Sequence, residues 1–79
     1  MHDYDTSKLR GRIIEKFGSQ KRFCEINKFS ISFVSQYLNG TMDLSQTTID
    51  RWAEALNIDI LDIPVYFFNK KVHETERDG

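Results

Sequence analysis

Side chains able to recognise a base edge or a protein surface gather in the middle of the chain. On a helix through this stretch, the residues predicted to face outward are Ile31, Ser32, Ser35 and Gln36. The Gln36 amide can pair with adenine through both of its groups, the hydroxyls of Ser32 and Ser35 can meet bases or phosphates, and Ile31 can pack on a thymine methyl. An uncharged solvated face is the plainer interpretation, but an exposed Ile31 with Phe33 is typical of a binding surface. The pattern leaves open whether that surface meets bases or protein.

Other candidate contacts would go to a phosphate backbone. Gln20 opens a predicted helix, where its side chain and the backbone N–H groups can hold a phosphate. Asn39 can add a backbone or amide contact at the end of the next helix, and Ser30, which caps that helix, belongs to the same surface. Lys and Arg side chains on phosphates supply affinity and salt dependence but no sequence preference. The cationic candidates are Arg10, Lys21, Arg22 and Lys28, accompanied by Lys8 and Arg12.

The sequence lacks the residue groups that catalysis requires. It contains no recognisable Ser/His/Asp set, no carboxylate pair in an apolar setting and no glycine-rich phosphate loop. His2 and His73 lie near the two ends of the chain and lack metal-ligand spacing. We therefore expect a protein that is not an enzyme and that has no catalytic residue, metal or cofactor.

Length and charge bound these interpretations. The 79 residues predict one domain over residues 1–71 and a flexible polar tail over 72–79. The net charge is −1, yet residues 8–28 carry +5 and residues 40–68 carry −4, so one half can face phosphate and the other water or a partner. The single cysteine, Cys24, fits a reducing compartment. Because no apolar run is long enough to span a membrane, the expected location is the cytoplasm.

Short helices must position these side chains. Caps and apolar spacing predict helices over residues 7–17, 19–27, 30–40, 45–57 and, as one short turn, 59–63. Gly18 is expected to stop the first helix, and Asn27-Lys28 to form the turn between the second and third. The segment Val65–Phe68 is predicted to be either extended or an apolar clamp across the domain.

The apolar stripes of these helices predict one core. Trp52 is expected to lie in this core rather than to contact a ligand, and Tyr66, Phe67 and Phe68 are expected either to cover it or to form a dimer interface. The predicted core residues are Leu9, Ile13, Phe17, Phe23, Cys24, Ile26, Phe29, Val34, Tyr37, Leu38, Ile49, Trp52, Ala53 and Leu56.

The order of these residues resembles the Cro and lambda-repressor type of helix-turn-helix domain, a large family of bacterial and phage regulators. It is similar in particular to small Cro-like proteins of phages from Gram-positive bacteria, and the resemblance covers most of the chain. Two features depart from the family pattern, because Lys28 stands where a glycine is usual and the third helix carries no Lys or Arg. The matching segments are Ser19-Gln20, Phe23-Cys24, Phe29-Ser30, Val34-Ser35, Asn39-Gly40 and Trp52–Ile58.

The resemblance implies a compact all-α domain of five helices in the cytoplasm of a bacterial host cell. The leading expectation is a sequence-specific DNA-binding regulator, a Cro-like phage repressor that binds an operator in double-stranded DNA as part of a lysogeny switch. A homodimer would place two third helices about 34 Å apart in successive major grooves.

An alternative of a different class is a modulator of repression. Such a protein would use its third-helix face to bind the DNA-binding domain of a partner repressor. The uncharged third helix, the pair Ile31 and Phe33, and the acidic net charge favour it.

Overall fold

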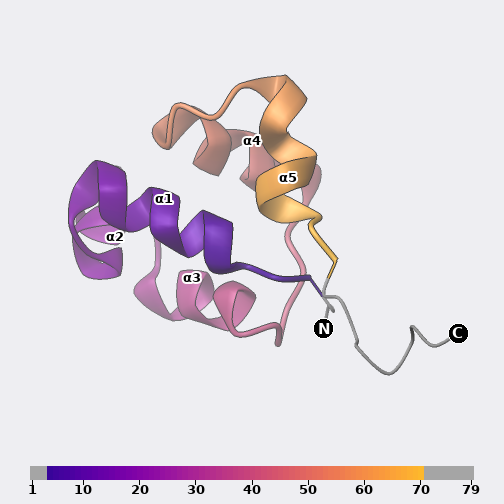
Figure 1. The fold of residues 1–79 in the computed structure, drawn as a ribbon. Helices are drawn as coiled ribbons and strands as arrows, with labels where there is room; N and C mark the ends of the chain where they lie inside the picture. The colour runs from indigo at the N-terminus through magenta and orange to yellow at the C-terminus, as the bar shows by residue number, and fades with distance from the viewer. Residues whose placement is uncertain (1–3, 71–79) are drawn as a thin grey trace, which may run out of the picture.

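Five α-helices and one 3-10 turn make up residues 4–70, the part of the chain that the computed structural model describes (Figure 1). The predicted all-α fold of five helices with a short last one is confirmed. The expected tail over 72–79, residue 71 and both histidines lie outside the described residues. In chain order the elements are α1 (Ser7–Phe17), α2 (Gln20–Asn27), α3 (Ile31–Leu38), α4 (Gln46–Ala55), η1 (Ile60–Asp62) and α5 (Ile63–Phe67).

Three serines begin three of the helices. The hydroxyl oxygens of Ser19, Ser30 and Ser45 each accept a hydrogen bond from the backbone N–H three residues later, at 3.1, 3.2 and 3.2 Å. These bonds satisfy N–H groups that lack a partner in the first turn of a helix. Thr6 precedes α1 without such a bond, because its hydroxyl donates instead to the carbonyl of Leu38 at 2.8 Å.

The turn between α2 and α3 is made by Lys28 in a left-handed conformation, with φ of 61°. Asn27 stays in α2, and its side-chain amide donates to the carbonyl of Phe23 at 2.9 Å. A left-handed conformation costs a residue with a Cβ about 1 kcal/mol relative to glycine. The departure at Lys28 therefore leaves the turn in place at a small energetic cost.

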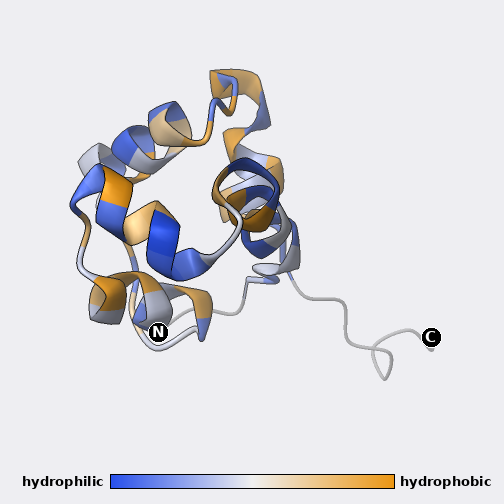
Figure 2. Cartoon of the chain, turned by 90° about the vertical axis from the view of Figure 1, so that its left-hand side faces the viewer, coloured by the Kyte–Doolittle hydropathy of each residue, from blue (hydrophilic) through white to orange (hydrophobic). Residues whose placement is uncertain are grey.

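Trp52 lies at the centre of an aromatic core. Its side chain is 1% exposed. Hydrophobic and hydrophilic residues alternate along the helices, as expected when each helix has one buried side (Figure 2). Edge-to-face and tilted ring pairs of this kind add to the stabilisation from area burial. The rings within 6.5 Å of the Trp52 ring belong to Phe23, Phe29, Phe33, Tyr37 and Phe67.

The predicted core is confirmed at most positions and wrong at Ile26. Ile26 is 56% exposed on α2, although its spacing from Phe23 suggested an inward position. The structure adds Ile58, Ile63 and Phe67 to the buried set. A helix of only 8 residues gives few turns from which to judge the buried side, so its outer positions are ambiguous.

The segment Val65–Phe68 is not extended, because most of it lies in α5, which begins at Ile63 and carries Pro64 in its first turn. Proline is tolerated there since its missing N–H would have no partner. Phe67 is fully buried, and its carbonyl accepts a hydrogen bond from the Tyr37 hydroxyl at 2.9 Å. This bond connects α5 to α3, so Phe67 covers the core.

Candidate functional site

The third-helix face consists of Ile31, Ser32, Phe33, Ser35 and Gln36. Ser32 and Gln36 are exposed, and the Gln36 side-chain amide donates to the Ser32 hydroxyl at 3.3 Å. Ile31 is 49% exposed, which is high for a large aliphatic side chain. The structure thus exposes Ile31, Ser32 and Gln36, an aliphatic side chain with two uncharged polar ones, whereas Ser35, also expected to face outward, is only partly exposed.

Phe33 does not point freely outward as expected. It is partly buried, and its ring meets the Trp52 ring edge-to-face with centroids 6.5 Å apart. The expectation that Phe33 is exposed is wrong, because its ring packs on the aromatic core along one side. The residue instead ties the third-helix face to the centre of the molecule.

Arg10, a predicted phosphate contact, is bound to the C-terminal end of α3. One guanidinium nitrogen donates to the Leu38 carbonyl at 2.9 Å and to the Asn39 side-chain oxygen at 3.0 Å, and another donates to the Thr6 hydroxyl at 3.4 Å. Carbonyls at the end of a helix lack partners within the helix and carry partial negative charge. Arg10 and Asn39 therefore help to fix the position of α3, and part of the Arg10 guanidinium is engaged within the fold.

Arg12 does the same for α4. Its guanidinium donates to the carbonyls of Leu56 and Asn57 at 3.0 and 2.8 Å. It also lies 3.6 Å from the Glu15 carboxylate and 6.0 Å from the centre of the Tyr66 ring. Two of the cations on α1 are thus engaged within the fold, so the basic half of the sequence overstates the charge available to a phosphate backbone.

The remaining predicted contacts are distributed over α2 and its turn. Lys21, Arg22 and Lys28 are exposed, whereas Gln20 is partly buried. Gln20 lines a hollow of about 250 Å³ whose other walls include Ile14 and the end of α3. Ile14 is 52% exposed and was not predicted as a contact, although its place beside the stripe of Leu9, Ile13 and Phe17 was a usable signal.

Two buried groups have shifted pKa values, and neither belongs to the exposed part of the face. Burial, with a smaller effect of Glu25, raises the pKa of the Cys24 thiol, so Cys24 is a structural rather than a reactive cysteine. Burial raises the pKa of Tyr37 to about 12, and the charges of Tyr4 and Asp43 contribute. The exposed side chains of the face, Ile31, Ser32 and Gln36, are neutral.

Within residues 4–70, no group of three or more His, Cys, Asp or Glu side chains is placed to hold a metal ion. No helix in that same range is long and apolar enough to cross a membrane.

Comparison with known proteins gives a family match and a similar solved structure. A family model described as "Protein of unknown function (DUF739)" matches residues 2–70. No curated protein matches the chain. The solution structure of the modulator of repression of the temperate bacteriophage TP901-1 from Lactococcus lactis is similar with a TM-score of 0.74. The two sequences are 39% identical over 90% of this chain and 96% of that one.

This similarity overturns the leading expectation of a Cro-like repressor that binds an operator. The similar structure is that of a modulator of repression, not of a repressor. The physical reason is visible in the fold, since α3 carries no cation and Arg10 is bound to the end of α3. With its family model matching nearly every described residue, the chain belongs to the DUF739 family of proteins of unknown function and is similar over most of its length to a phage modulator of repression.

Proposed function

We propose that this protein modulates repression in a bacteriophage by binding the DNA-binding domain of a partner repressor through the third-helix face. The observation that carries the proposal is the similarity to the TP901-1 modulator of repression, at 39% identity over 90% of the chain. In this proposal, α2 and α3, which resemble the helix-turn-helix of Cro-type proteins, bind a protein. In this proposal the protein acts by binding and not as an enzyme.

The chemistry of the third-helix face supports a protein partner. Protein interfaces are centred on a few apolar or aromatic anchors surrounded by polar groups that can be satisfied on binding. Ile31 supplies an aliphatic anchor that is half exposed, and Ser32 and Gln36 supply hydroxyl and amide groups beside it. DNA backbones, in contrast, are held mainly by Lys and Arg, which α3 lacks.

The rigidity of the face also supports the proposal. Phe33 packs on Trp52, and Arg10 bonds the opposite end of α3. A helix fixed at both ends loses little conformational freedom on binding, so more of the contact energy remains as affinity.

Binding to the DNA-binding domain of a repressor from the same phage genome tests the proposal. Isothermal titration calorimetry should show a saturable complex, and Ile31→Asp should weaken it by at least about 30-fold because a charge would be buried at the anchor. Circular dichroism checks that the variant folds.

Ile60→Asp is the matched control, since Ile60 is an exposed isoleucine outside the third-helix face. It should leave affinity for the repressor domain within about twofold, as surface changes outside an interface usually do. Equal weakening by the two variants, or no complex with the wild-type protein, would refute the proposed function.

A further inference from the structure

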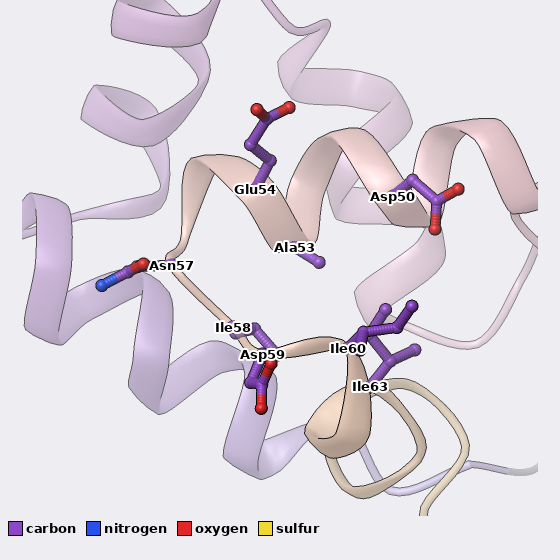
Figure 3. Close-up of a pocket in the computed structure, with 8 residues that line it drawn as sticks. All are labelled: Asp50, Ala53, Glu54, Asn57, Ile58, Asp59, Ile60 and Ile63. Atoms are coloured by element: carbon purple, nitrogen blue, oxygen red, sulfur yellow. The ribbon is translucent and has the colours of Figure 1, made fainter.

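A groove of about 540 Å³ lies between α4 and the η1 turn, away from the third-helix face. Ala53, Ile58 and Ile63 provide its buried apolar surface. Figure 3 shows Ile60 and Ile63 on the side of the opening across from Asp50 and Ala53. The groove is therefore an apolar slot between two elements of the chain.

Two large aliphatic side chains at the edge of this groove are mostly exposed to solvent. Ile60 is 73% exposed and its neighbour Leu61 is 80% exposed, both in a turn of three residues. Contiguous exposed apolar surface beside a concave site is typical of an interaction surface. Val65 and Phe68 on and after α5 are also partly exposed, at 44% and 40%.

Carboxylates surround the apolar slot. Asp50, Glu54 and Asp59 line it, and the Asp59 carboxylate makes no capping bond to η1. Arg51 is the one cation in residues 40–68 and does not line the groove. This charge repels phosphate and anionic lipid but attracts Lys and Arg. We call the slot with these carboxylates the acidic groove.

We propose that the acidic groove is a second docking surface, which binds a cationic amphipathic segment of a partner protein. An aliphatic side chain of that segment inserts between Ala53 and Ile60, while its Lys or Arg side chains pair with Asp50 and Asp59. Charge complementarity selects this occupant, because the walls alone would accept any aliphatic group.

The acidic groove and the third-helix face can be occupied together. In Figure 1, α3 lies on one side of α1 and α5, which follows η1 directly, lies on the other. A repressor domain on the third-helix face thus leaves the acidic groove open. The second surface would let the protein hold a further protein element while it is bound to the first.

The probe is a short synthetic helical peptide with Lys and Arg on one face and a central Leu. Titrated into the isotopically labelled protein, it should shift backbone amide signals within α4 and η1 and leave those of α3 in place. Asp50→Asn combined with Asp59→Asn should weaken peptide binding about tenfold, because each exposed ion pair contributes about two- to fivefold. Higher salt should weaken it similarly.

Matched control variants change similar residues outside the groove lining. Asp62→Asn combined with Glu25→Gln makes the same change in net charge outside the lining residues and should alter affinity less than twofold. Ile60→Ala should weaken binding, whereas Ile26→Ala, at an exposed isoleucine of α2 that does not line the groove, should have little effect. Circular dichroism confirms that each variant keeps its helices.

Three outcomes would overturn the proposal. These are amide shifts spread over the whole acidic half of the protein, equal effects of the two double variants, and equal binding of spermidine, which would show a site for small polycations. Because the peptide is measured without the repressor domain, failure here leaves the proposed function intact. Loss of repressor binding in Ile31→Asp leaves the acidic groove intact in the same way.

Discussion

The third-helix face and the acidic groove are each held by one arginine of α1, but they differ in what lies behind them. Arg10 bonds the end of α3, and Arg12 bonds the end of α4 beside the groove. Phe33 joins the third-helix face to the Trp52 ring, whereas Ile60 and Leu61 project from a three-residue turn into solvent. The third-helix face is therefore joined to the core through a side chain of its own, whereas Ile60 and Leu61 at the edge of the groove can change without disturbing the core.

The largest expected effect concerns Phe33 and Ile60. Phe33→Ala should lower the free energy of unfolding by about 2 to 3 kcal/mol, because it removes a partly buried ring and leaves a gap beside Trp52. Ile60→Ala should change it by less than about 0.5 kcal/mol, since its side chain is mostly in water. Urea denaturation of both variants measures the difference. Equal losses would show that the two surfaces are equally connected to the core.

The next effect is a pH dependence through Tyr37, which connects α3 to α5. Its folded pKa of about 12 lies above the usual value of 10, so the folded protein keeps a proton that the unfolded chain releases. Stability from this group is complete below pH 10 and falls as pH rises towards 12, by about 2 kcal/mol. Thermal unfolding between pH 8 and 12 measures this loss.

Tyr37→Phe serves as the control for that titration. It removes the ionisable hydroxyl and the bond to Phe67, so it should lower stability at neutral pH and flatten the decline that Tyr37 causes at alkaline pH. An alkaline decline of the same size in Tyr37→Phe would assign it to other groups.

The smallest effect concerns the two arginines themselves. Arg12→Ala should destabilise the protein by about 1 to 2 kcal/mol through the loss of two charge-assisted bonds to carbonyls, and Arg10→Ala by about 1 kcal/mol because it is more exposed. Lys16→Ala, an exposed position on the same helix, is the control and should stay within about 0.5 kcal/mol. If Lys16→Ala destabilised the protein as much as Arg12→Ala, the hydrogen bonds of Arg12 to the carbonyls would not account for its effect on stability.

Local patterns predicted the helices well because the interactions that begin and end them are local. Ser19, Ser30 and Ser45 each bond an N–H three residues ahead, and Gly18 accommodates a φ of 86°. Such features can be recognised without knowing what packs nearby. The start of α5 was harder, because proline disfavours helical angles before it, yet contacts with the core hold Ile63 in a helical conformation.

The candidate site was predicted only in part, because the exposure of its side chains depends on contacts with residues far away in the sequence. Ile31, Ser32 and Gln36 lie outward as their positions on the helix predicted. Phe33 was misplaced, since its partner is Trp52 in another helix. The acidic groove was not predicted at all, although the negative charge of residues 40–68 was visible, because its walls come from α4 and η1 together.

The sequence by itself determined the helical elements, the aromatic core around Trp52, the uncharged third helix and the two-sided charge, since these follow from residue type and short spacing. Only the tertiary structure decided that Arg10 and Arg12 bond helix ends 28 to 45 residues away, so that part of each guanidinium is engaged within the fold. The residue type fixes the charge of a side chain. Which carbonyl, ring or carboxylate that side chain contacts depends on how the helices pack.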